Sequence, residues 1–267
     1  MTRLQALIFD VDGTLADTEE VHRQAFNRAF HEFGLAWDWT PACYQDLLFV
    51  SGGRERITHC GAELAKQFAS PIAFEQFVRD LHRRKTEIYA ALLSSGQIRL
   101  RQGVERLIHE ARQDGVVLGI ATSSAWTNLK TLLDNNLSAD WPTWFAAIET
   151  ADTVETKKPS PAVYNAVLRR IKLDPRDCVA VEDTENGLQA ASAAGLCTLI
   201  TTHRFTRTHN FAGAAAVLDG LGEPERPMAV LHGENHGYEY VNLGFLDQLL
   251  HPHVEHPHWE QQQMAFA

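Results

Sequence analysis

Short apolar runs, separated by longer stretches with helical periodicity, make up most of the chain. The runs have the length of buried strands and lie at residues 4–9, 116–121, 145–148, 178–181 and 197–201, with a weaker run at 215–218. Between them, apolar residues recur at helical spacing over residues 104–113, 125–134, 161–171 and 185–194. Strand and helix in repeated succession predict an α/β fold, a Rossmann-like parallel sheet with helices on both faces.

A block of helices interrupts this succession after the first predicted strand. Its apolar residues follow helical spacing over 18–33, 55–68 and 73–93. Prolines and glycines lie in the connections between these stretches. We predict that residues 17–92 form a helical cap domain, inserted into a core domain of residues 1–16 and 93–222. Extra helices packed on a single domain are the alternative.

Residues 223–267 form a C-terminal extension with a mixed pattern. Pro224 and Pro227 mark a break, and residues 240–250 have the spacing of an amphipathic helix. The last seventeen residues, 251–267, are rich in histidine and proline, and we expect them to be poorly ordered. Their histidines are expected to be solvated, because the prolines prevent regular metal-ligand spacing.

Composition restricts the class of protein. A chain of 267 residues suits one or two domains, and its 45% of hydrophobic residues can form a packed core. The net charge of −10 disfavours nucleic acid or an anionic membrane as a partner. The four cysteines form no zinc pattern, and no apolar run approaches the ~18 residues of a membrane span. We therefore expect a soluble, cytoplasmic, monomeric protein without a signal peptide.

Polar residues follow three of the predicted strands, at the edge where parallel α/β sheets bind ligands. They are Asp10 and Asp12 after the first run, Thr122 and Ser123 after the second, and Glu182 and Asp183 after the fourth. Each pair taken alone is as compatible with a turn or a helix cap as with a binding site. Their recurrence at one edge favours a site.

The four carboxylates at this edge would repel one another unless a cation lay between them. Repulsion among neighbouring carboxylates raises some of their pKa values, and a divalent ion removes the conflict. Mg²⁺ suits oxygen ligands and is commonly shared between a few carboxylates and a phosphate. The alternating spacing of Asp10 and Asp12 would let one bind metal and attack while the other transfers protons.

A lysine later in the chain supplies positive charge for this edge. Lys158 precedes Pro159, which restricts its backbone to an extended conformation at the entry to a predicted helix. Lys157 is interpreted as a solvated surface lysine. An anionic ligand would find its local cationic contact in Lys158.

The order of these segments resembles the four motifs of the haloacid dehalogenase superfamily. The segments are DVDGT at residues 10–14, Thr122 at a strand end, Lys158-Pro159, and Glu182-Asp183 followed by Gly187. The helical insertion resembles the cap of the beta-phosphoglucomutase-like branch. Four motifs in order are far more specific than the first alone.

Within that branch the chain is similar to the CbbY-type sugar phosphatases. The similarity lies in residues 10–27, GGRERI at 52–57, and residues 153–164 and 180–195. It implies a Mg²⁺-dependent phosphatase that converts xylulose 1,5-bisphosphate, an inhibitor of Rubisco, into xylulose 5-phosphate. The C-terminal extension departs from the pattern.

The resemblance also implies roles for individual residues. Asp10 would be the nucleophile and Asp12 the general acid and base, while Thr122, the backbone N–H of Ser123, and Lys158 would hold the phosphoryl oxygens. The metal ligands would be Asp10, Asp183, the backbone carbonyl of Asp12, and Glu182.

The cap is expected to recognise the rest of a phosphorylated sugar. Arg54 is favoured for a second phosphate because arginine matches phosphate geometry bidentately, and Lys85 would add a point charge. Asp17, Glu20 and His22 would contact sugar hydroxyls. His22 also falls where the mutase-like branch has a cap histidine, so a phosphosugar mutase stays an alternative, as does a non-catalytic sugar-phosphate sensor.

Overall fold

The computed structural model describes residues 4–94, 96 and 98–251, and its centre is one mixed sheet. The strands lie in the order β3-β2-β1-β4-β5-β6-β7. β1 to β6 pair in parallel, and β7 is antiparallel to β6. Their bounds are β1 Ala6–Phe9, β2 Val117–Ala121, β3 Ala147–Glu149, β4 Cys178–Glu182, β5 Cys197–Thr201, β6 Ala216–Leu218 and β7 Val230–His232. The predicted Rossmann-like parallel sheet is confirmed.

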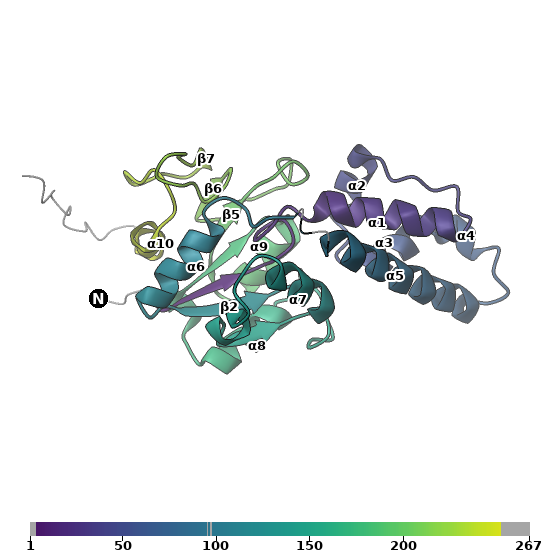
Figure 1. Ribbon diagram of the computed structural model, residues 1–267, viewed down its shortest axis with the longest axis horizontal. Helices are drawn as coiled ribbons and strands as arrows, with labels where there is room; N and C mark the ends of the chain where they lie inside the picture. Colours follow the sequence, from purple (N-terminus) through teal and green to yellow (C-terminus); the bar gives the residue numbers. More distant parts are fainter. Residues whose placement is uncertain (1–3, 95, 97, 252–267) are drawn as a thin grey trace, which may run out of the picture.

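Helices cover both faces of the sheet (Figure 1). On one face, α6 (Val104–Gln113), α7 (Trp126–Asp134) and α10 (Leu243–Leu250) share a core with Leu7 and Phe9 of β1. On the other face, α8 (Ala162–Ile171) and α9 (Glu185–Ala193) pack on Ala6 and Ile8. β1 and β4 are buried along their whole length, which explains why these strands are continuously apolar.

The residues between β1 and α6 form a separate helical bundle beside the sheet (Figure 1). Its helices are α1 (Glu19–Glu32), α2 (Pro41–Leu47), α3 (Gly53–Cys60), α4 (Ala62–Ala65) and α5 (Pro71–Leu93). Phe26, Phe30 and Trp39 form its aromatic centre, with ring centroids of Phe26 and Trp39 4.6 Å apart. α5 begins where the Ser70 side chain accepts a hydrogen bond from the N–H of Ala73. We refer to this bundle as the cap.

Several predicted element bounds are wrong. The helix predicted at 55–68 is divided, because α3 ends at Cys60 and α4 covers only Ala62–Ala65. Gly61 lies between the two, and glycine is unfavourable in a helix interior. The third strand covers Ala147–Glu149, since the 3₁₀ helix Trp141–Trp144 precedes it. The short helix α2 was not predicted. A second 3₁₀ helix, Pro175–Asp177, leads into β4.

The C-terminal extension packs on the core as far as the described residues reach. β7 adds an edge strand that the sequence pattern did not predict, and the predicted helix begins at Leu243. Asn242 fixes that start, because its side chain accepts from the N–H of Phe245 at 2.8 Å. The Asp247 carboxylate accepts from the N–H of Leu4, also at 2.8 Å. The predicted disorder at 251–267 lies almost wholly outside the described residues.

None of the helices in the described part of the chain combines the length and the apolar character needed to cross a membrane.

Candidate active site

The polar residues predicted at the strand ends come together because of the strand order. β1 lies between β2 and β4, so Asp10 after β1 is flanked by Thr122 after β2 and by Asp183 after β4. All three side chains are buried and line one cavity. Ser123 lines the same cavity. This is the edge at which parallel α/β sheets bind ligands.

Lys158 lies between two of the carboxylates. Its Nζ donates to Asp10 Oδ1 at 2.6 Å, to the carbonyl of Ala121 at 2.9 Å, and to Glu182 Oε1. Burial alone would lower its pKa, but the two carboxylates outweigh burial and the pKa of Lys158 is raised. The charged form of Lys158 is therefore favoured beside Asp10.

Glu182 is completely buried and holds this lysine in position. Its Oε1 also accepts from the hydroxyl of Tyr164 at 2.7 Å, and its Oε2 accepts from the N–H of Asp183 at 3.1 Å. A Cβ at Gly187 would lie 2.0 Å from the Glu182 carboxylate, so the closeness of α9 requires glycine there. Both oxygens of Glu182 are thus engaged in hydrogen bonds within the protein, an arrangement that orients Lys158.

Asp183 is held from the opposite side. Its Oδ2 lies 2.9 Å from His203 Nε2, and its Oδ1 accepts from the Thr14 hydroxyl at 3.4 Å. Gly13 has a φ of +86°, and a Cβ there would lie 2.2 Å from Asp183 Oδ2. The glycine of the DVDGT segment is thus required both by its backbone conformation and by this close approach.

Three carboxylates form a candidate metal centre. One oxygen each of Asp10, Glu182 and Asp183 lies within 4.8 Å of the others. Burial raises the pKa of Asp183 to about 6, and burial together with the two neighbouring carboxylates raises that of Asp10 despite Lys158. A buried group of oxygen donors whose negative charge is destabilised fits a hard divalent cation. Asp10 and Asp183 fit best as its ligands, since Glu182 is committed to Lys158 and Tyr164.

Asp12 faces the cap and lies outside this group of three. Its Oδ1 accepts from the Thr18 hydroxyl at 2.6 Å, lies 3.1 Å from His22 Nε2, and accepts from the Tyr89 hydroxyl at 3.3 Å. Burial alone would raise the pKa of Asp12, but its contacts with His22 and Thr18 outweigh burial and hold that pKa below its usual range. Because these side chains occupy the Asp12 carboxylate, the group that Asp12 can offer to a metal ion is its backbone carbonyl.

A buried lysine of the cap continues this chain of contacts. Lys85 Nζ lies 2.5 Å from His22 Nδ1, and the His22 ring stacks on Tyr89 with centroids 3.9 Å apart. Burial lowers the pKa of Lys85 to about 7, and burial and Lys85 together lower the pKa of His22. A neutral His22 that accepts from Lys85 at Nδ1 donates its Nε2–H to Asp12.

The cavity above these residues lies between core and cap and has a volume of about 710 Å³. That volume suits a small-molecule ligand. Its cap wall carries five cationic side chains, Arg54, Arg56, Arg79, Arg83 and Lys85, and Lys157 of the core lines the same cavity. Arg54 is exposed, as a second anion contact requires, whereas Lys85 is buried against His22.

The structure corrects three expectations for single residues. Lys157 is not simply solvated, because its Nζ pairs with Glu55 of the cap at 2.7 Å and so links core to cap. Asp17 does not line the cavity but pairs with Arg101. Glu20 does not line it either, since its carboxylate binds the Arg23 guanidinium one turn along α1. Both of these carboxylates are thus paired outside the lining of the cavity.

Sequence reasoning missed His203, Tyr89 and Tyr164. A signal for His203 existed, since Thr202-His203 follows the fifth apolar run just as Asp10 follows the first. Tyr89 and Tyr164 lie on helices at ordinary core spacing, where nothing distinguishes a tyrosine that binds Asp12 or Glu182 from one that fills the core.

The comparisons with known proteins agree with this geometry. A family model described as haloacid dehalogenase-like hydrolase matches residues 7–201. The chain belongs to the haloacid dehalogenase-like hydrolase family. This hydrolase is 48% identical over 225 residues to the plasmid protein CbbY of Cupriavidus necator, across 84% of this chain and 89% of that protein. The prediction of a phosphatase of this family, similar to CbbY, is confirmed.

Solved structures are similar to this hydrolase over both the core and the cap. CbbY from Rhodobacter sphaeroides in complex with phosphate superposes with a TM-score of 0.73 and is 39% identical, over 81% of this chain and 94% of that one. A structure of its D10N mutant in complex with xylulose 1,5-bisphosphate gives the same TM-score, identity and coverage.

Proposed function

We propose that the chain is a Mg²⁺-dependent phosphatase that removes the C1 phosphate of xylulose 1,5-bisphosphate and releases xylulose 5-phosphate. The observation that carries the proposal is the placement of Asp10 beside Lys158 at the base of a cavity whose opposite wall is cationic. Such a cavity can hold one phosphate at the strand ends and a second at the cap. The complex of a CbbY mutant with this bisphosphate supports the choice of sugar.

The first step is attack by an Asp10 carboxylate oxygen on phosphorus. The Asp10 O–P bond forms as the bond between phosphorus and the sugar oxygen breaks, which leaves an aspartyl-phosphate. Lys158, the Thr122 hydroxyl and the backbone N–H of Ser123 bind the phosphoryl oxygens as negative charge develops on them. Because Lys158 is already fixed by Glu182, its alignment requires little reorganisation.

Asp12 transfers the protons. The incoming phosphate dianion raises the low pKa of Asp12 and favours its protonated form, which donates to the departing sugar oxygen. Asp12 then takes a proton from the water that attacks the aspartyl-phosphate, and phosphate leaves. His22, held by Lys85 and stacked on Tyr89, keeps the Asp12 carboxylate in place for both steps.

Asp10, Asp183 and the backbone carbonyl of Asp12 would hold the Mg²⁺ ion. When bound, it would withdraw charge from the phosphoryl group and offset the repulsion between the carboxylates. His203 and Thr14 keep the Asp183 carboxylate oriented for this purpose.

Phosphate release from a panel of substrates tests the proposal. The panel holds xylulose 1,5-bisphosphate, ribulose 1,5-bisphosphate, fructose 1,6-bisphosphate and beta-glucose 1-phosphate, each with and without Mg²⁺. We expect the first to give the highest kcat/KM and xylulose 5-phosphate as product, in keeping with a role in removing an inhibitor of Rubisco. Preference for another bisphosphate would contradict the assignment of xylulose 1,5-bisphosphate as substrate. Turnover without a divalent ion would contradict the dependence on Mg²⁺.

The contact between His22 and Asp12 also suits a phosphosugar mutase, in which the aspartyl-phosphate passes to a second sugar oxygen. The same panel separates the two reactions. A mutase would isomerise beta-glucose 1-phosphate without net release of phosphate.

A further inference from the structure

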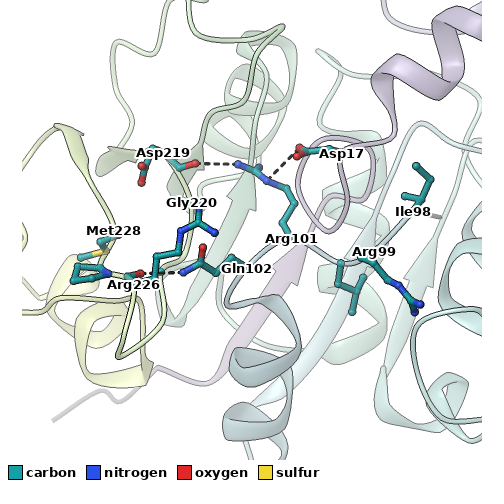
Figure 2. Close-up of a pocket in the computed structure, with 12 residues that line it drawn as sticks. Asp17, Ile98, Arg99, Arg101, Gln102, Asp219, Gly220, Arg226 and Met228 are labelled. Carbon is teal, nitrogen blue, oxygen red and sulfur yellow. Dashed lines mark hydrogen bonds and ion pairs between the residues drawn. The ribbon is translucent and has the colours of Figure 1, made fainter. Parts of the chain in front are cut away.

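A second cavity, of about 530 Å³, lies where the two connections between core and cap meet the C-terminal extension (Figure 2). Asp17 lies on the first connection and residues 98–102 on the second. The segment after β6, from Asp219 to Met228, closes the other side. This cavity and the one above Asp10 share no lining residue.

Arg101 forms the inner wall of this second cavity and has no donor left for a ligand. Its Nη2 donates to the carbonyls of Thr202 at 2.6 Å and Asp219 at 3.1 Å. Its Nη1 donates to the carbonyls of Thr201 and Gly13, and its Nε lies 3.3 Å from the Asp17 carboxylate. Arg101 thus ties the loop that carries Asp12 to the ends of β5 and β6.

Arg226, by contrast, has an unpaired guanidinium group. Its backbone is fixed, since its carbonyl accepts from the Gln102 side chain at 2.9 Å. Its side chain is exposed, and within residues 4–94, 96 and 98–251 no carboxylate pairs with it. Figure 2 shows this side chain directed across the cavity toward Gly220 and Arg101.

The charges of the lining favour an anion. Arg99, Arg101 and Arg226 contribute three positive charges, and Asp17 and Asp219 two negative ones, so the lining is cationic in a chain of net charge −10. The guanidinium groups of Arg101 and Arg226 repel each other across the cavity, and an anion bound beside Arg226 would offset that repulsion. Asp219 is committed, because its Oδ1 accepts from the N–H of Ala229 at 2.7 Å.

We infer that this cavity binds a small phosphate-bearing anion, with the Arg226 guanidinium as its principal contact. Arginine offers phosphate a planar pair of N–H donors, and the Arg226 fork is one that no side chain of the described protein occupies. Arg99 adds charge from the far side of the cavity, where Figure 2 shows its guanidinium pointing away from Arg226. The ligand would be free phosphate or a small phosphate monoester, since the volume accommodates either.

Calorimetric titration of the full chain tests this inference. The probes are inorganic phosphate and 3,4-dihydroxybutyl-1-phosphonate, a non-hydrolysable analogue of a phosphate monoester. The variant is Arg226→Gln, and Arg169→Gln is the control, because Arg169 is an exposed arginine of α8 outside both cavities.

We expect the wild-type chain and Arg169→Gln to bind two equivalents of at least one probe. In Arg226→Gln, one of the two events should weaken at least tenfold while the other is unchanged. A free-phosphate ligand would give the second event with inorganic phosphate, and an ester ligand only with the phosphonate. If no binding event is weakened in Arg226→Gln, the inference is overturned, whether the wild-type chain shows one event or two. Absence of turnover with every substrate of the panel would contradict the proposed function, but it would not affect the binding result for Arg226→Gln.

Discussion

The two walls of the cavity above Asp10 are built in different ways. On the core wall, the charged groups are buried and already paired, as Lys158 is with Asp10 and Glu182, and Asp183 is with His203. On the cap wall, Arg54 is exposed and lines the cavity without a fixed carboxylate partner among the described residues. Preorganised charge suits a reaction common to a family, and adaptable charge suits the choice of a substrate. The difference fits the proposed function, in which the core carries out the chemistry and the cap selects the sugar.

The largest expected effect comes from removing the proposed nucleophile, Asp10, from the core wall. Asp10→Asn should lower kcat toward a generic phosphate ester by about 10³-fold or more, because an amide cannot form the acyl-phosphate bond. Phosphate release with Mg²⁺ present measures this. Asp46→Asn, an exposed carboxylate of α2, makes the same chemical change away from the cavity and should keep full activity.

The next effect concerns the candidate metal ligand Asp183. In the wild-type chain Mg²⁺ should raise the thermal midpoint, because a cation relieves the repulsion between buried carboxylates. Asp183→Asn should abolish most of that shift and reduce kcat about 10²-fold or more. The measurement is differential scanning fluorimetry with and without Mg²⁺. An equal Mg²⁺-induced shift of the thermal midpoint in both proteins would show that Asp183 is not a metal ligand.

A third effect concerns Lys85, the buried lysine of the cap. The pKa of Lys85, about 7 in the folded chain, lies below its value near 10.4 in the unfolded chain. The unfolded state therefore binds more protons between these values, and the free energy of unfolding should rise with pH there. Lys85 contributes ~2–3 kcal/mol of this rise between pH 7 and pH 9.

Denaturant unfolding of the wild-type chain and of Lys85→Met checks this contribution. The difference in slope between the two curves isolates Lys85 from other titrating groups. Parallel curves would show that Lys85 is not the buried ammonium group that the structure places against His22.

The sequence allowed the core wall to be predicted much better than the cap wall. Asp10, Lys158 and Asp183 are positioned by strands whose apolar runs are plain in the sequence, so their convergence follows from the topology of parallel sheets. The cap residues depend on helix packing. Asp17 and Glu20 were expected at the substrate, but their charges are satisfied locally by Arg101 and Arg23.

Side chains whose role is to contact another charged side chain could not be predicted from the periodicity of the sequence. The Tyr89 hydroxyl reaches Asp12 from the last turns of α5, and Lys157 reaches Glu55 of the cap. Both contacts are set by the angle between cap and core. β7 was missed because three residues, two of them exposed, carry too short a pattern to distinguish a strand from a loop.

The most direct test of the division between the walls compares two substrates in one cap variant. Arg54→Gln and its control Arg28→Gln, an exposed arginine of α1 outside the cavity, are assayed for kcat/KM. The substrates are xylulose 1,5-bisphosphate and a generic monophosphate ester. Loss of a charged contact of ~1.5–3 kcal/mol predicts a decrease of about tenfold or more for the bisphosphate, with the ester unchanged. Equal losses on both substrates would contradict the assignment of sugar selection to the cap.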